Sequence, residues 1–126
     1  MTRRQDRVAY YIFNTAKDAA LRQMRQRLWA VDAGERHRAA LAAGDLVLVY
    51  LGAPESVFIG RARLASVVDA HGNVTLAEVE EWDPPVPMRD VLAQIGPSET
   101  AKAEFDHAVV LISASEYEAA ISAASA

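Results

Sequence analysis

Flat aromatic side chains next to short polar ones are the residues in this sequence best suited to hold a planar ligand. Trp29 stands alone between two predicted helices, flanked by Arg27 and Asp32, while Asn14 and Thr15 directly follow an aromatic, strand-like segment. An indole offers a surface on which a heterocyclic base can stack, and amide and hydroxyl groups can hydrogen-bond to its edge. Trp29, Asn14 and Thr15 could supply both contacts, although a lone tryptophan is also commonly a large core residue.

Two further aromatic side chains are candidate ligand-binding residues. Trp82 directly precedes Asp83 and Pro84 and could form a second wall of a pocket, or it could pack on the proline-rich segment that follows. Tyr10 and Tyr11 are neighbours in a predicted strand and therefore point to opposite faces, so that at most one of them can line a pocket. We include Tyr11 in the candidate set.

Basic residues cluster around Trp29 in the sequence. They could contact the phosphates that flank a captured base, or they could form a solvated helix face. The candidates for phosphate contact are Arg22, Arg25, Arg27, Arg36 and Arg38. Arg61 and Arg63 lie on another predicted strand. The hairpin partner of that strand carries Glu78 and Glu80, so cross-strand ion pairs are expected and these two arginines are excluded from the site.

Patterns that would support catalysis are missing from the sequence. The chain has no cysteine, its six glycines are scattered singly, and its three histidines show no metal-ligand spacing. Asp106–His107 and Glu80–Glu81 are sequence neighbours that would face opposite sides of a strand. We therefore predict a protein that is not an enzyme, with no catalytic residue, no metal site and no cofactor.

Length and composition predict one globular domain over residues 1–126. The chain is 52% hydrophobic and 24% charged, has no apolar run long enough for a membrane span, and begins without a signal-peptide pattern, so a cytoplasmic protein is expected. The net charge is -4, but residues 1–63 carry 11 Lys and Arg against 6 Asp and Glu, whereas residues 64–126 carry 2 against 11. The basic and acidic halves can form a polarised surface, or they can neutralise each other across strands. On a polarised surface the acidic C-terminal half could bind a protein partner.

Strands and helices do not alternate regularly, which favours an α+β fold whose five or so strands curl into a small barrel. Strands are predicted over 8–13, 45–51, 56–68, 74–82 and 108–112. Helices are predicted over 17–28, capped by Thr15, over 35–43, ending at Gly44, and over 88–95, followed by a terminal helix that starts at a capping box of Ser115 and Glu118. Residues 83–87 (DPPVP) are predicted to leave the sheet because three of them lack a backbone donor. The side chains expected to be buried in or against the sheet are Leu46, Leu48, Val109 and Leu111.

The order of several segments resembles the EVE domain family, a member of the PUA-like superfamily that also holds the YTH and ASCH modules. The resemblance rests on the aromatic first strand, on LWAV around Trp29, and on four longer segments. These are GDLVLVY (44–50), FIGRARLASVV (58–68), VEEWDPPVPMRDVL (79–92) and VVLISASEYEAAI (109–121). Together they span nearly the whole chain.

The resemblance implies a curled mixed β-barrel of about five to six strands with flanking helices, and a pocket beside the first strand that captures a modified, typically methylated, base of DNA or RNA. On this basis Trp29 corresponds to the aromatic wall, and Asn14 and Thr15 to the polar edge. The sequence departs from the family in two places: Tyr11 stands where a tryptophan is frequent, and Arg27–Leu28 replaces the small residue before Trp29. Two alternatives remain open, namely a protein-interaction module and a sensor that uses the pocket for a free nucleoside.

Overall fold

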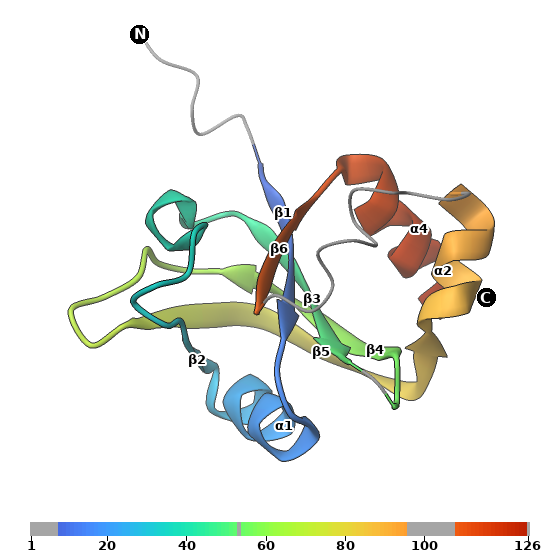
Figure 1. The fold of residues 1–126 in the computed structure, drawn as a ribbon, viewed down its shortest axis with the longest axis horizontal. Helices are drawn as coiled ribbons and strands as arrows, with labels where there is room; N and C mark the ends of the chain where they lie inside the picture. The colour runs from blue at the N-terminus through green and yellow to red at the C-terminus, as the bar shows by residue number, and fades with distance from the viewer. Residues whose placement is uncertain (1–7, 53, 96–107, 126) are drawn as a thin grey trace, which may run out of the picture.

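A computed structural model describes residues 8–52, 54–95 and 108–125 (Figure 1). Six strands and three α-helices alternate irregularly along this part of the chain. They are β1 (Tyr10–Asn14), α1 (Lys17–Gln26), β2 (Leu28–Ala30), the 3-10 turn η2 (Arg38–Ala40), β3 (Leu46–Leu51), β4 (Val57–Leu64), β5 (Asn73–Pro87), α2 (Met88–Ile95), β6 (Val109–Ile112) and α4 (Ala114–Ser125).

The six strands form one mixed, curled sheet in the order β2-β5-β4-β3-β1-β6. β1 and β3 run parallel, and every other neighbouring pair is antiparallel. The register shifts once between β3 and β4 and twice between β4 and β5. Extra residues of this kind bend a strand and increase its twist, so the sheet can wrap around a core. The predicted α+β fold with a curled mixed sheet and flanking helices is confirmed.

Alternation along the central strands divides the apolar residues into two cores. Tyr11, Phe13 and Val47 belong to one cluster, together with Ala20 and Met24 of α1. Their neighbours Ile12, Leu48 and Tyr50 belong to the other, together with side chains of α2 and α4. Successive residues of a strand point to opposite faces, so the two clusters lie on opposite faces of the sheet. Figure 1 shows α2 and α4 next to each other, with α1 placed apart beside β2.

Several predicted elements are found where the sequence placed them. Residues 88–95 form α2, and β3 is an inner strand whose last five residues are all buried. Arg61 and Arg63 form the predicted cross-strand ion pairs with Glu80 and Glu78, at 2.8 and 2.9 Å. The expected burial is correct for Leu48 and Val109 but wrong for Leu111, which is 48% exposed. Leu46 is half-buried.

The prediction that residues 83–87 leave the sheet is wrong, because β5 continues to Pro87. The register jumps from the pair Gly60 and Glu81 to the pair Phe58 and Val86, so the four residues 82–85 of β5 lie opposite a single residue of β4, Ile59. Two of the three prolines therefore lie where no ladder hydrogen bond is required. Within the described residues, the outer edge of β5 is paired only with β2, over 73–75, so no second strand pairs with the prolines there.

The predicted helix over 35–43 is also wrong, since only the 3-10 turn η2 forms there. The carboxylate of buried Asp45 accepts the backbone N–H of Ala42 at 3.0 Å and that of Ala9 at 3.2 Å. The backbone N–H of Ala42, which a helix would use for its own hydrogen bonds, therefore donates to the side chain of Asp45 just before β3. Gly44 still provides the left-handed turn before this strand, with φ of 97°.

The ends of the first and last helices differ from the predictions by one or two residues. Ala16, not Thr15, is the N-cap of α1, and it makes no side-chain cap. α1 ends at Gln26, and its C-cap Arg27 has a left-handed φ of 60°. Leu28 therefore starts β2 and is 40% exposed instead of lying on the buried helix face. In α4 the capping box is formed by Ser113 and Glu116, two residues before the predicted pair, with reciprocal bonds of 2.8 and 3.1 Å.

Candidate base-binding cavity

A cavity of about 260 Å³ lies where β1 ends, next to α1, β2 and the start of β6. Four residues predicted from the sequence line it together. The predicted residues are Asn14, Thr15, Arg22 and Trp29, and the others are Gln23, Ala30, Val31, Asp32, Glu35, Ala108 and Val109. Residues from positions 14–15 and 22–35 of the chain are therefore brought to one site.

Hydrogen bonds fix the elements around this cavity. The backbone N–H of Asn14 donates to the carbonyl of Ala108 at 2.9 Å, which holds the end of β1 against the start of β6. The side-chain carbonyl of Gln23 accepts the backbone N–H of Ala30 at 2.7 Å, which ties α1 to β2. Two sides of the cavity are therefore tied together, β1 to the start of β6 and α1 to β2.

Trp29 is more deeply buried than a pocket wall was expected to be. Its exposed fraction is 3%, and its ring packs against Phe13 with 5.3 Å between the ring centroids. A pocket wall that stacks on a base would be partly open to solvent in the free protein, and Trp29 is not. Trp29 is a core residue that also lines the cavity.

A second cavity of about 340 Å³ adjoins the first. It is lined by two of the predicted arginines, Arg36 and Arg38, and by Glu35, which lines both cavities. The remaining lining residues are Ala33, Ala39, Leu41, Val67 and Val68. Glu35, in the polar segment that follows Trp29, thus lies between the cavity beside Trp29 and the cavity lined by Arg36 and Arg38.

The carboxylate of Glu35 is a feature that the sequence analysis missed. Its Oε1 atom is buried and has no hydrogen-bond partner in the described part of the chain. A buried oxygen left unpaired costs roughly 1–3 kcal/mol, so such an atom favours any donor that reaches it. Glu35 and Asp32 follow Trp29 by six and three residues, and Gln23 follows Arg22 directly. Proximity to the candidate residues was the only sequence signal for these three.

The other two predicted arginines are placed outside both cavities. Arg25 forms an ion pair with Glu81 at 3.0 Å. The hydrogen bond from Arg25 lowers the pKa of Glu81 below its ordinary value, and the same bond raises the pKa of Arg25. Arg27 is exposed at the end of α1. Arg25 is thus engaged within the protein, whereas Arg27 points to solvent near the site.

Tyr11 lines neither cavity. It is 2% exposed, belongs to the same core cluster as Trp29, and lies beside His37 with 6.0 Å between the ring centroids. Tyr10 faces the other cluster and packs against Tyr117 at 5.2 Å. The two tyrosines do point to opposite faces, and Tyr11 is a core residue.

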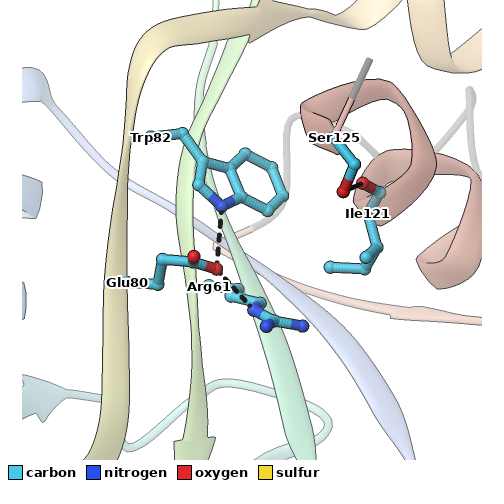
Figure 2. A network of polar contacts seen from close by, with 5 residues as sticks. All are labelled: Arg61, Glu80, Trp82, Ile121 and Ser125. Carbon is cyan, nitrogen blue, oxygen red and sulfur yellow. Dashed lines mark hydrogen bonds and ion pairs between the residues drawn. The ribbon is translucent and has the colours of Figure 1, made fainter.

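Trp82 lies at a different place in the molecule. It lines an open groove of about 510 Å³, formed by residues 80–87 of β5 with Asp90, Ala123 and Ala124. Its indole N–H donates to Glu80 at 3.2 Å, and Glu80 also accepts from Arg61 (Figure 2). The bond from Trp82, followed by that from Arg61, lowers the pKa of Glu80. The structure therefore does not bring Trp82 and Trp29 together as two walls of one pocket.

Within residues 8–52, 54–95 and 108–125, no group of three or more potential metal ligands is found. The candidate acid–base pair Asp106–His107 lies outside the described residues. Glu80 and Glu81 form ion pairs with different arginines, Arg61 and Arg25. None of the helices in the described part of the chain has the length and hydropathy needed to span a membrane.

No protein-family profile matches the sequence, and no curated protein matches it either. The fold is similar to that of human THYN1, solved in complex with 5-methylcytosine containing DNA, with a TM-score of 0.70 at 9% identity over 94% of this chain and 98% of that one. It is also similar to ASCH from Zymomonas mobilis, with a TM-score of 0.57 at 11% identity over 90% and 94% of the two chains.

A third similar structure is Rpa0253 from Rhodopseudomonas palustris, with a TM-score of 0.68 at 18% identity, covering 94% of each chain. All three matches extend over nearly the full length of both partners. At these identities the likeness concerns the fold. The chain therefore has the PUA-like fold of the ASCH and EVE type, as the sequence resemblance predicted.

Proposed function

We propose that the protein is a non-catalytic binding module that captures one modified base of DNA or RNA in the cavity beside Trp29. The observation that carries the proposal is the convergence of Asn14, Thr15 and Trp29 on that single cavity. A protein of the same fold, human THYN1, has been solved in complex with 5-methylcytosine containing DNA, which supports a methylated base as the ligand.

The size and lining of the cavity fit a base better than a larger ligand. Its volume of about 260 Å³ is below the roughly 300–1,000 Å³ of sites that bury a drug-sized molecule. Trp29 supplies the aromatic contact, and Asn14 and Thr15 supply donors and acceptors at the β1 end. A base that has left its stack requires this combination of apolar and hydrogen-bonding surface.

The basic side chains around the site can contact the flanking phosphates. Arg22 lines the proposed base cavity and is exposed, and Arg36 and Arg38 line the adjoining one. Arg27 is exposed at the nearby end of α1. Phosphate contacts of this kind position a strand without reading its sequence. We infer that the captured base enters the first cavity while its backbone passes over these arginines.

Binding to short oligonucleotides that differ only in the modification of one base would test the proposal, in single-stranded and duplex form. Thr15→Val removes the hydroxyl and keeps the side-chain shape, so affinity should fall about 2- to 12-fold for one lost hydrogen bond. Thr75→Val is the matched control, because Thr75 is exposed on β5 and lines neither cavity. Equal binding of all oligonucleotides, or equal losses in the two variants, would contradict the proposal.

The same experiment separates a nucleic-acid reader from a nucleoside sensor. A sensor would bind the free modified nucleoside as tightly as the oligonucleotide that contains it. A reader should bind the oligonucleotide more tightly, because only the oligonucleotide brings phosphates to the arginines.

A protein-interaction function is a second candidate, favoured by the groove around Trp82. Four carboxylates line this groove, with prolines and the indole between them: Glu80, Glu81, Asp83 and Asp90. Glu80 and Glu81 are ion-paired with Arg61 and Arg25, whereas Asp83 and Asp90 are exposed. Such a surface fits a basic peptide, whose cations can approach the two aspartates and the aromatic ring. Titration with an arginine-rich peptide, followed by the indole N–H resonance of Trp82, would test it. A glutamate-rich peptide of equal length serves as the control.

A further inference from the structure

The cavity lined by Arg36 and Arg38 offers more apolar surface than a phosphate contact requires. Besides the two arginines and Glu35, its lining residues are all aliphatic: Ala33, Ala39, Leu41, Val67 and Val68. Val67 is 60% exposed, more than any other large apolar side chain in the described part of the chain. This cavity therefore presents guanidinium groups and open aliphatic surface to the same ligand.

Hydrogen bonds attach the segment that carries Val67 to β5. The backbone N–H of Ala65 donates to the carbonyl of Thr75 at 2.8 Å. The hydroxyl of Ser66 donates to the carbonyl of Val67 at 2.8 Å and accepts the backbone N–H of Thr75 at 3.0 Å. The exposed side chain of Val67 thus follows directly on residues that are bonded to the sheet.

We propose that this cavity binds the nucleotide next to the captured base, with the ring of the neighbouring base against Val67 and its phosphate at Arg36 and Arg38. The inference rests on the proposed function of the cavity beside Trp29 and extends the ligand from one nucleotide to two successive ones. The two cavities share Glu35 as a lining residue, so they adjoin each other as successive units of one strand do.

The chemistry of the cavity favours a nucleotide over a bare anion. An anion would need only the arginines, whose guanidinium groups can donate two parallel hydrogen bonds to a phosphate. A nucleotide also brings the face of a base, which can cover the aliphatic surface at Val67. The cavity is lined by two arginines and one glutamate, which leaves an excess of positive charge. Its volume of about 340 Å³ exceeds the 260 Å³ of the cavity proposed for the captured base.

Removal of single bases from a bound oligonucleotide tests the inference. The probe carries one central 5-methylcytosine, and two variants of the probe have an abasic position directly before or directly after it, so that every phosphate is kept. One of the two variants should bind about 3- to 10-fold more weakly than the intact probe, because roughly half of one valine side chain is exposed to water again. The other variant should lose less.

Val67→Ser removes the same contact from the side of the protein. It should weaken binding of the intact probe by a similar factor and leave binding of the sensitive abasic variant nearly unchanged, because one contact cannot be lost twice. Leu111→Ser is the matched control, since Leu111 is also exposed, at 48%, and lines neither cavity. The control should not change the affinity for either probe. Circular dichroism of both variants checks that they are folded.

The outcomes separate this inference from the proposed function. If neither neighbouring base contributes, or if Val67→Ser weakens the intact and the abasic probe by the same factor, the adjoining cavity contacts phosphates only and the inference is overturned. A third variant of the probe, abasic at the central position, tests the proposed function. If it binds as well as the intact probe, the cavity beside Trp29 captures no base from this strand, and the proposed function is overturned together with the inference.

Discussion

Trp29 packs against Phe13 in the core while it also lines the proposed base cavity. With only 3% of its surface exposed, Trp29 stabilises the fold before any ligand binds. We expect Trp29→Ala to lower the free energy of unfolding by about 3–5 kcal/mol, the range for truncation of a large buried aromatic side chain. Denaturant unfolding followed by far-UV circular dichroism measures this change.

Trp82→Ala is the matched comparison for this prediction, because Trp82 is only half-buried at the groove along β5. It should cost clearly less stability than Trp29→Ala. Equal losses, or a small loss at Trp29, would show that the Phe13 contact contributes little. Because Trp29→Ala affects folding, the binding role of the cavity is better tested at Thr15, which lies outside the core clusters.

The sequence predicted those parts of the fold whose residues follow one clear pattern. The apolar run of β3 predicted an inner strand, and the alternation of arginines and glutamates on β4 and β5 predicted their ion pairs. The prolines of 83–87 obey a local rule against ladder positions, but a register shift between β4 and β5 places residues 82–85 where that rule has no cost. Such a register shift depends on how two strands pair and cannot be recognised in the sequence of either strand alone.

The candidate site was predictable to a similar degree. Asn14, Thr15, Arg22 and Trp29 were chosen by residue type and by resemblance, and they do line one cavity. Trp82 and Tyr11 were chosen on the same grounds and lie elsewhere, because their positions depend on the curl of the sheet and on which face each strand residue occupies. Glu35 was missed because a buried, unpaired carboxylate oxygen is a property of the folded chain and not of a motif.

Ser113 should contribute to stability as the N-cap of α4. Its side chain accepts the backbone N–H of Glu116, and the Glu116 carboxylate accepts the backbone N–H of Ser113. Ser113→Ala removes one of these two bonds and should lower the free energy of unfolding by roughly 0.5–2 kcal/mol. Ser115→Ala, at the residue predicted from the sequence, should change stability much less. If Ser115→Ala lowered the thermal stability more than Ser113→Ala did, the N-cap would be Ser115 and not Ser113.

Acidification should weaken the ion pair between α1 and β5. The hydrogen bond from Arg25 lowers the pKa of Glu81 in the folded protein. A carboxylate with a lowered folded pKa stabilises the fold above its unfolded pKa, about 4.3 for glutamate, and loses that contribution as the pH falls through the folded value. Glu81→Gln should therefore melt below the wild type at pH 7, and the difference should shrink as the pH falls below the unfolded pKa and disappear below the folded one. A difference that did not shrink at all on acidification would mean that Glu81 acts through packing and not through its charge.

Two arginines on α1, only three residues apart, should differ sharply in nucleic-acid binding. Arg22 is exposed and lines the proposed base cavity, whereas Arg25 is paired with Glu81. With two or three phosphate contacts to a single strand, log affinity should fall with log salt at a slope of about -1.4 to -2, from roughly 0.7 per contact. Arg22→Gln should make this slope shallower by about 0.7 and weaken binding of modified and unmodified strands alike, as expected for a phosphate contact.

Arg25→Gln is the matched control, because it removes the same charge from the same helix. It should leave the salt slope unchanged, since Arg25 is bonded to Glu81 and lines neither cavity. Fluorescence anisotropy of a labelled oligonucleotide over a series of salt concentrations measures both slopes. Equal salt slopes in the two variants would show that the arginines of α1 attract the strand only by long-range electrostatics and that Arg22 makes no specific phosphate contact. If only Arg25→Gln changed the salt slope, the bound strand would pass near Arg25 and Glu81 and not over the cavity beside Trp29.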